Sequence, residues 1–476
     1  FMENITSFEW SAVSAEAALF CGAVLAVLFE ALFPKRGSAV CAFAVAAMIA
    51  AIALDLLAPV PELSFGGTLG GRGGFGVFIT ACALLSALLG FGYFAKGGAR
   101  RCEFLAVLMI CAAALSIFAR SRNLMLSFVA LECATVCLYV MAAWGRSRAS
   151  SLEGAAKYLV ISGVSGGLFL LGIAFVYGAG LESGVDFLNF ENFTLGFCSV
   201  KFAIGMLLVA CAALFKLAAF PFQFWSPDVY QGSPTPVSAF FAVGSKAAGI
   251  VFLAQICLAV DFSAVPAAAS RAAFAVSAIA ALTIAVGNLG AITQTNAKRL
   301  MGFSGIANAG YLLVLLASLI KYPKSAELFE ISLYFYLAAY MFANYGIFFV
   351  INQFEGEDDS PLEFSDFRGL IRKNPVADST LIISLASLAG IPPTAGFFGK
   401  LLILILAWYA QLYVLMGVMI AGSAVSIFYY FSWMRASIDV GAGDERSLRD
   451  SAAMLPTMIA LSAATLVFGV FFFFKV

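Results

Sequence analysis

Long runs of apolar residues constrain this chain more than any other feature. The runs are about 20 residues long, which is the length that an α-helix needs to cross a bilayer, and they are apolar on all sides. Such runs favour membrane helices over barrel strands, because barrel strands alternate lipid-facing and lumen-facing residues. Hydrophobic residues make up 62% of the 476 residues and charged residues only 11%, more apolar surface than a soluble fold can bury. The sequence predicts an all-α polytopic membrane protein.

The apolar runs predict fourteen transmembrane helices. They are expected near residues 11–33, 39–58, 74–94, 103–119, 123–144, 155–178, 198–220, 236–260, 268–291, 299–320, 329–353, 377–409, 412–434 and 453–474. The twelfth run is too long for one straight span at 1.5 Å per residue, and it contains the motif GIPPTAGFFGK. Proline removes a backbone donor and clashes with the preceding turn, so we expect this helix to break at Pro392 and Pro393.

The basic residues between the predicted helices indicate an orientation. If both termini lie outside, the cytoplasmic side holds Lys35, Arg36, Lys96, Arg100, Arg101, Arg146, Arg148, Lys298, Arg299, Arg368, Arg372, Lys373, Arg435, Arg446 and Arg449. The outer side then holds Arg72, Arg120, Arg122, Arg271, Lys321, Lys324 and Lys475. The cytoplasmic side thus holds fifteen basic residues and the outer side seven, which agrees with the enrichment of cytoplasmic loops in Lys and Arg. Arg120 and Arg122 are the discordant pair, at the end of the fourth helix.

The titratable composition limits the cofactors that the chain can hold. It has no histidine, which excludes His-ligated haem, copper or zinc within this chain. The ten cysteines lie mostly in apolar runs and form no C-x-x-C pair, so we interpret them as small buried hydrophobic residues. Basic and acidic residues number 27 each, and this balance gives no indication of a nucleic-acid partner. We expect no cofactor and no metal.

A proline-rich loop flanked by two lysines is the most unusual stretch of the chain. In CAALFKLAAFPFQFWSPDVYQGSPTPVSAFFAVGSK, residues 211–246, Lys216 and Lys246 lie inside apolar helical runs on either side of the loop. A lysine inside a membrane helix costs about 2.5–3.5 kcal/mol on insertion scales, so it is a candidate functional residue. The pattern indicates an ion or proton path. The alternative for Lys216 is an end residue that extends its ammonium toward the membrane surface.

Three further charged residues are candidates for the same path. Glu132 lies about nine residues into its helix, or about 14 Å, close to the middle of a hydrocarbon core of about 30 Å. Lys400 follows the expected break in the twelfth helix and has apolar neighbours on both sides. Lys157 stands near the start of its helix, where it either functions or simply reaches the cytoplasmic surface. The alternative for Glu132 is a structural polar contact between helices.

Lysine suits proton transfer inside a membrane. Burial favours the neutral amine over the ammonium, whereas a neighbouring carboxylate favours the ammonium. A buried lysine with a movable charged neighbour is therefore a switchable proton store. Broken helices add free backbone groups and water, which a proton chain needs.

Three ordered motifs resemble a known family. They are KLAAFPFQFWSPDVYQGSPTPVSAFF followed by SKAAG, TNAKRLMGFSGIANAGYLL at 295–313, and GIPPTAGFFGK at 390–400. They are similar to the antiporter-like membrane subunits of respiratory complex I (NADH-quinone oxidoreductase) and to the related multisubunit cation/proton antiporters. DVYQGSPTPV most resembles subunit N, the bacterial counterpart of mitochondrial subunit 2. The resemblance covers residues 100–435.

The resemblance implies a fold and a domain plan. Its members have fourteen helices, two inverted five-helix repeats with broken helices 7 and 12, and no redox cofactor of their own. We expect one integral membrane domain over 1–476. Within it we expect N-terminal helices at 11–94, a first repeat at 103–260, a second repeat at 268–434 and a C-terminal helix at 453–476.

The resemblance also assigns roles. The family's glutamate of the fifth helix and its lysines of the sixth, seventh, eighth and twelfth helices correspond here to Glu132, Lys157, Lys216, Lys246 and Lys400. These five residues are the expected proton relay.

The chain departs from the family pattern at two positions. Gln223 and Asn308 stand where relatives usually have histidine. Neither amide titrates near neutral pH, but both donate and accept hydrogen bonds. We therefore expect these two residues, with Tyr311, to orient water rather than to store protons.

The expected function is proton translocation driven by electron transfer in other subunits of a complex I-type quinone oxidoreductase. The expected partners are neighbouring membrane subunits and the lipid bilayer, and the expected location is the bacterial inner membrane, with both termini on the outer side. The alternatives are a subunit of a cation/proton antiporter or membrane-bound hydrogenase, and a structural anchor that no longer pumps.

Overall fold

The chain folds almost entirely into helices. The computed structural model describes residues 10–33, 37–57, 63–65, 67–70, 74–93, 101–146, 148–197, 199–354, 361–439 and 454–473. The chain forms two compact units. The first comprises Phe1–Met141, Tyr158–Lys216 and Gly244–Val265, and the second comprises Ala142–Lys157, Leu217–Val243 and Pro266–Val476. The repeat boundaries expected from the sequence stay a prediction.

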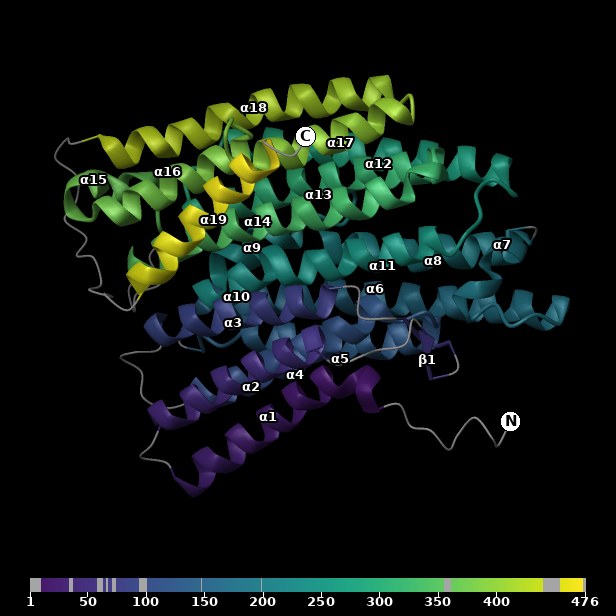
Figure 1. Cartoon of the computed structure of the whole chain (residues 1–476), viewed down its shortest axis with the longest axis horizontal. Coiled ribbons are helices and arrows are strands. Elements are labelled where there is room, and N and C mark those ends of the chain that lie inside the picture. Colours follow the sequence, from purple (N-terminus) through teal and green to yellow (C-terminus); the bar gives the residue numbers. More distant parts are fainter. Residues whose placement is uncertain are drawn as a thin grey trace. The chain divides into compact units, whose positions relative to one another are not determined.

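The first unit is a helical bundle with a small hairpin. Its elements are η2 (Trp10–Val13), α1 (Ser14–Leu32), α2 (Gly37–Leu57), β1 (Leu63–Ser64), β2 (Leu69–Gly70), α3 (Phe75–Tyr93), α4 (Arg101–Arg120), α5 (Leu124–Ala142), most of α6 (Ala149–Ser183), η3 (Phe190–Asn192), α7 (Phe193–Gly196), α8 (Val200–Leu217) and α11 (Lys246–Leu258). The two strands pair antiparallel. Helix α1 packs against α2 and α4, and α4 also packs against α3 and α11 (Figure 1).

The second unit contains the remaining helices. They are α9 (Trp225–Gly232), α10 (Thr235–Phe240), α12 (Pro266–Ile292), α13 (Ala297–Lys321), η5 (Pro323–Ser325), α14 (Ala326–Phe354), η6 (Phe364–Phe367), α15 (Leu370–Lys373), α16 (Pro375–Ala389), α17 (Ala395–Tyr409), α18 (Tyr413–Ile438) and α19 (Leu455–Phe473). Helix α13 is central, because it packs against α9, α12 and α17, and α14 packs against α16, α17 and α19.

The helices reproduce the expected number of membrane crossings. In the part of the chain that the structure describes, eleven helices are long and apolar enough to span a membrane, and α3, α16, α17 and α19 are shorter apolar helices. If α16 and α17 are the two halves of one broken span, these helices account for fourteen crossings. The all-α polytopic membrane fold is therefore confirmed.

The predicted break in the twelfth span is also confirmed. Helix α16 begins where the side chain of Asn374 accepts a hydrogen bond from the backbone N–H of Ala377. It ends at Gly390, whose φ of 84° is the left-handed conformation that glycine adopts without strain. Helix α17 starts only at Ala395, so the Pro392–Pro393 pair lies in the gap. The chain thus exposes helix ends at a depth where other spans are continuous.

The seventh and eighth spans are irregular as well. Helix α8 ends at Leu217, Ala218 has a φ of 54°, and helical structure resumes only with α9. The eighth span, Thr235–Leu258, is continuous but contains a π-helical segment, η4 (Phe241–Ser245). Helix α6 is 35 residues long and extends beyond both ends of the predicted 155–178, because its polar first turns outside the apolar run are helical too.

A buried ion pair explains the discordant arginine at the end of α4. Arg120 donates from Nη1 to Oε1 of Glu16 at 2.5 Å and from Nη2 to the carbonyl of Ala12 at 3.0 Å. Ser116 donates to the same Oε1 at 2.7 Å. Both charged side chains are buried, so Arg120 joins α1 to α4 and is not a loop charge of the kind that the orientation rule counts.

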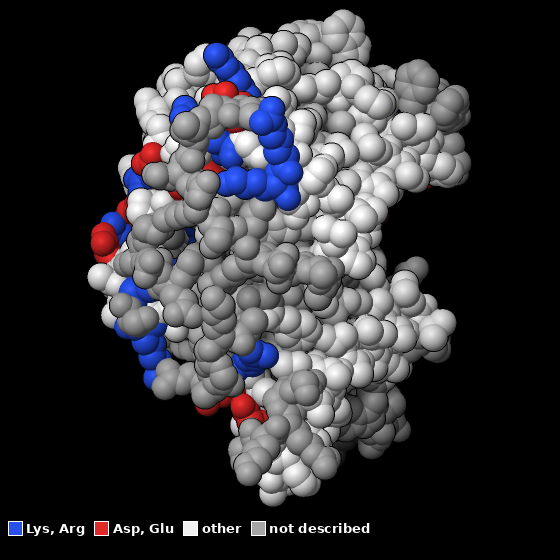
Figure 2. Space-filling view, turned by 90° about the vertical axis from the view of Figure 1, so that its left-hand side faces the viewer, with Lys and Arg blue, Asp and Glu red and all other residues white. Residues whose placement is uncertain are grey.

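Charge is unevenly distributed on the surface. On the face drawn in Figure 2, the described basic and acidic side chains gather along one side, while the rest of the described surface is uncharged. Several basic residues used for the orientation lie outside the described residues, namely Lys35, Arg36, Arg72, Lys96, Arg100, Arg446, Arg449 and Lys475.

Candidate functional site

Lys216 lies at the centre of a polar site in the first unit. It is the penultimate residue of α8 and is fully buried. Its Nζ donates to Oγ1 of Thr135 on α5 at 3.3 Å and to the hydroxyl of Tyr158 on α6 at 3.2 Å. The ammonium is also 6.0 Å from the centroid of the Tyr158 ring. Three helices therefore meet at this ammonium. The hydrogen-bond acceptors described for it within the unit are both hydroxyl groups.

Glu132 lies one turn before Thr135 on α5 and is half-buried. Its carboxylate interacts electrostatically with Lys216, but among the described residues the two do not form a direct ion pair. The carboxylate faces α6 at Gly166, where an added Cβ would be only 2.5 Å from Oε1 of Glu132. The glycine thus leaves a recess for the carboxylate, close to Lys216 but not bound to it.

Lys246 is buried directly after the π-helical segment. It is the first residue of α11, and the span that contains it is buried from Thr235 to Ala254. A π-helical segment shifts the backbone hydrogen-bond register and often occurs at functional sites. The structure therefore places this lysine at an irregular point of its helix, a feature that has no signature in the apolar pattern.

Lys400 lies at the broken twelfth span in the second unit. It is buried in the second turn of α17, and its Nζ donates to the carbonyls of Leu388 at 2.7 Å and Ala389 at 3.1 Å. These carbonyls are at the C-terminus of α16, where the last four have no partner within the helix and carry partial negative charge. The ammonium also lies 5.1 Å from the centroid of the Tyr311 ring. The break thus supplies the electrostatic partners of this buried lysine.

A cavity about the size of one water molecule adjoins Lys400. Its volume is about 10 Å³, and its lining includes Asn308, Tyr336, Ser387 and Lys400. A cavity of that size holds one water only when polar groups face it. Amide, hydroxyl and ammonium groups all line this cavity, so a water here would connect Lys400 with the side chains of α13 and α14.

Hydroxyl and amide groups continue from this cavity. Tyr336 donates to Oδ1 of Asn308 at 2.6 Å, and Nδ2 of Asn308 donates to the carbonyl of Ser304 at 2.8 Å. The hydroxyls of Ser304 and Tyr430 are 2.5 Å apart. Asn308 therefore lies inside a line of hydrogen bonds that starts at the cavity which Lys400 also lines.

The other two predicted water-orienting residues differ in their surroundings. Gln223 is buried in the loop between α8 and α9, and no described residue hydrogen-bonds to its Oε1. The hydroxyl of Tyr311 accepts a hydrogen bond from Ser423 at 3.5 Å. The ring of Tyr311 also lies beside Lys400. The Oε1 atom of Gln223 is available to accept a hydrogen bond from water.

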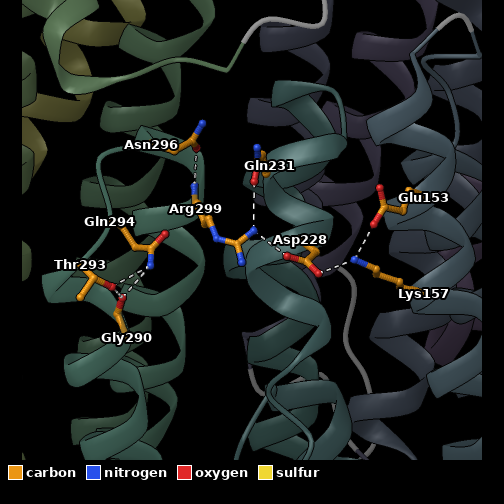
Figure 3. Close-up of polar contacts among 9 residues, drawn as sticks. All are labelled: Glu153, Lys157, Asp228, Gln231, Gly290, Thr293, Gln294, Asn296 and Arg299. Carbon is orange, nitrogen blue, oxygen red and sulfur yellow. Dashed lines mark hydrogen bonds and ion pairs between the residues drawn. The ribbon is translucent and has the colours of Figure 1, made fainter.

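Lys157 belongs to a cluster of ion pairs at the start of α9. Asp228 accepts from Lys157 at Oδ2 (2.7 Å) and from Arg299 at Oδ1 (2.6 Å). Lys157 also pairs with Glu153 at 2.6 Å, and Arg299 donates to Gln231 at 3.1 Å. Figure 3 shows Asp228 between the two cations. The side chain of Lys157 is 42% exposed, so it lies in a partly solvated cluster.

The two cations act on the ionisation of Asp228. Burial raises the pKa of this carboxyl. The hydrogen bonds and positive charges of Lys157 and Arg299 lower it, and their combined effect is larger, so the pKa lies below its ordinary value. Asp228 therefore stays ionised at neutral pH. It acts as a fixed anion that joins α6, α9 and α13.

Close backbone contacts reinforce this joint and explain the YQG motif. An added Cβ at Gly232 would be 2.2 Å from the carbonyl oxygen of Ser150 in α6, and one at Gly302 in α13 would be 2.7 Å from Cα of Pro227. Lys298 donates to the carbonyl of Ser233 at 3.0 Å. In this motif, Gly232 allows the close contact with α6, and Gln231 before it accepts a hydrogen bond from Arg299.

Sequence reasoning missed several of these polar residues. They are Thr135, Tyr158, Asp228, Arg299, Ser304, Tyr336 and Tyr430. Hydroxyl groups inside apolar runs were the available signal, and Tyr158 directly follows a predicted lysine. Within the described residues, no three His, Cys, Asp or Glu side chains come together as a metal site.

The comparison with known families gives a clear result. Residues 121–426 match the family model of the NADH:quinone oxidoreductase/Mrp antiporter transmembrane region. The chain belongs to this family.

Similar proteins place the chain within the family more narrowly. It is 36% identical over 452 residues to NADH-quinone oxidoreductase subunit N 1 of Opitutus terrae, which covers 90% of this chain and 87% of that protein. It is 33% identical to subunit N of a Geobacillus species, with 98% of both chains covered.

Solved structures agree in fold. A chain of respiratory complex I from Thermus thermophilus has a TM-score of 0.80 and 29% identity, with 96% of this chain and 97% of that chain covered. A chain of the Mrp complex from Dietzia has a TM-score of 0.78 at 18% identity, with 98% and 95% covered, which shows a shared fold.

In this family member, the Asp228 cluster yields a stability prediction. Asp228→Asn keeps the size of the side chain but removes the charge that both cations bind. We expect it to lower the free energy of unfolding by roughly 1–3 kcal/mol, the range for hydrogen bonds to charged groups. The matched control is Glu153→Gln, because Glu153 binds the same lysine but is 67% exposed, and its loss should cost at most about 1 kcal/mol.

The same variants predict a pH dependence. The folded-state pKa of Asp228 lies below its unfolded value, about 3.9. Its stabilisation is therefore complete above about pH 4 and lost as the pH falls through the folded-state pKa. Thermal unfolding in detergent at decreasing pH should show less acid sensitivity for Asp228→Asn than for the natural protein. Equal acid sensitivity would contradict the assignment of Asp228 as a charged joint.

Proposed function

We propose that this chain is a proton-translocating membrane subunit of a complex I-type quinone oxidoreductase, acting with neighbouring membrane subunits. The subunit N proteins and the complex I chain that it resembles support this proposal. Electron transfer in other subunits would drive the charge rearrangements. The relay is Glu132, Lys216, Lys246 and Lys400, and the position of Lys157 in a solvated ion-pair cluster favours a role at the surface end of the path.

The contact of Lys400 with the ends of the broken helix carries the proposal. The ammonium contacts two free carbonyls and lies beside a cavity for one water, and a water there would link it to Asn308, Tyr336 and Ser304. These side chains donate and accept hydrogen bonds, so they would hold and orient the water that carries protons, without a titrating imidazole. Lysine is the group in this line that stores the proton.

Glu132 and Lys216 form the corresponding charged pair in the first unit. Lys216 is held by two hydroxyls rather than by the carboxylate. When the ammonium and carboxylate approach, the positive charge on Lys216 is favoured, and when they separate, the neutral amine is favoured. A small movement of Glu132 in the recess at Gly166 therefore controls release of the proton.

Lys400→Met tests the proposed function. A group that transfers protons contributes about 10²–10⁴-fold to rate, so vesicles with the assembled variant complex should retain about a hundredth or less of proton translocation. Electron transfer to an artificial acceptor should persist. The control is Lys373→Met, which removes an exposed lysine at the end of α15. Normal translocation by the Lys400 variant would refute the relay.

Gly166→Ala tests the role of the recess. The added methyl group would displace the carboxylate of Glu132, because their present separation would be 2.5 Å. We expect lower coupled proton translocation at normal assembly. Gly163→Ala is the matched control on the same helix, because a Cβ there meets nothing within 4 Å. If both variants pump equally well, the position of Glu132 does not control the path.

We further propose that both termini lie on the outer side of a bacterial inner membrane. The distribution of basic residues supports this orientation. A membrane-impermeant amine reagent should label exposed Lys324 in right-side-out vesicles and exposed Lys373 in inverted vesicles. Peptide mass spectrometry reads out both sites, and the reverse pattern would invert the topology.

A further inference from the structure

A deep groove opens on the second unit between α12 and α18. Its volume is about 530 Å³, and Lys321, the last residue of α13, lies in its wall. Its lining is mostly apolar and includes Ala273, Phe274, Ala278, Ala281, Leu415 and Val418. None of these residues belongs to the proposed relay, so the groove has a different purpose.

The groove is long enough to span one leaflet of a membrane. Its lining residues on α12 run from Ser270 to Ala281, which corresponds to about 16 Å along a helix. The hydrocarbon core of a bilayer is about 30 Å thick. A groove that begins at the end of α13 and follows α12 for this length therefore reaches the middle of the membrane.

Aromatic residues mark the mouth of the groove as a membrane interface. Trp408 and Tyr413 are both more than half exposed, and their rings contact each other edge to face at a centroid distance of 5.3 Å. Tyr413 also lines the groove. Exposed Trp and Tyr are enriched at the level of the lipid head groups. The polar end of a bound molecule would thus lie at the head-group level.

Positive charge gathers at the same end. Lys321 lines the groove, and among the described contacts it forms no ion pair. Arg271 and Lys324 are exposed in neighbouring turns. A cation at the interface without a protein anion fits a phosphate group, which a basic residue attracts by about 1 kcal/mol near the surface of an anionic membrane.

Two polar side chains, Ser277 and Gln411, also line the groove. The Oγ of Ser277 is shielded from solvent, and no described residue hydrogen-bonds to it. Gln411 lines the groove from a turn with a φ of 57°. Serine and glutamine donate hydrogen bonds, and the ester carbonyls of a glycerolipid accept them just below the phosphate.

We propose that this groove is a specific binding site for an anionic phospholipid. One acyl chain lies along α12, the phosphate binds Lys321, and the ester region lies near Gln411 and Ser277. A transmembrane helix is a poorer occupant, because it offers no phosphate group to Lys321 at the groove.

The test uses the purified complex that contains the full chain, placed in phosphatidylcholine nanodiscs. The probe is phosphatidylglycerol with a photoactivatable group on its acyl chain, and peptide mass spectrometry locates the label. We expect label within 270–281 and 411–418. Unlabelled phosphatidylglycerol should displace the probe, and unlabelled phosphatidylcholine should not. The readout is independent of pumping, so it stands or falls separately from the proposed function.

Two variants sharpen the test. Lys321→Ala should weaken labelling about fivefold, because one basic residue contributes about 1 kcal/mol to binding an anionic lipid. Lys373→Ala is the matched control, since this exposed lysine at the end of α15 does not line the groove, and should leave labelling unchanged. Ala278→Trp fills the groove and should abolish labelling.

Two results would overturn the proposal. Labelling that is equal for phosphatidylcholine and phosphatidylglycerol probes, and unaffected by Lys321→Ala, would show ordinary boundary lipid. Cross-links from the groove to a helix of a neighbouring subunit, with no lipid label, would show that protein covers it.

Discussion

The contact between a buried ammonium and the free carbonyls of a broken helix is the interaction on which this structure depends. A charged lysine in a membrane is costly unless it has a partner, and a continuous helix offers none, since its carbonyls are already bonded. The gap between α16 and α17 releases the carbonyls that bind Lys400. The break in the helix therefore provides acceptors for the ammonium of Lys400, and the ammonium in turn provides the hydrogen bonds that these carbonyls lack. A proton store of this kind requires irregular backbone at the depth of the membrane.

Polar side chains that stay neutral near pH 7 complete the proposed path. Hydroxyls of Thr135 and Tyr158 hold Lys216, and Asn308 with Tyr336 continues from Lys400. These groups pass hydrogen bonds in both directions but do not store a proton at neutral pH. In the proposed relay, lysines would store protons, and hydroxyls and amides would orient the water that carries them. The absence of histidine from this sequence is compatible with this chemistry, because no step requires an imidazole.

The charged groups of the proposed relay stand out in the sequence, whereas their hydrogen-bond partners do not. Glu132 and Lys400 stood out because a charge within an apolar run is conspicuous, and the paired prolines predicted the break before Lys400. Tyr336 was not predictable, because its partner Asn308 is 28 residues away and a tyrosine in an apolar helix has many possible neighbours. The π-helical segment before Lys246 has no residue pattern that distinguishes it from α-helix. The recess at Gly166 required knowledge of which helix faces Glu132.

The central claim is that the buried lysines must release a proton, and not merely carry charge. Arginine keeps the positive charge but does not deprotonate in proteins, so Lys216→Arg separates the two roles. The measurement is proton uptake by vesicles that contain the assembled variant complex, alongside electron transfer to an artificial acceptor. The account predicts that electron transfer continues while proton translocation is lost. Normal proton translocation in this variant would contradict it, because a fixed charge would then be sufficient.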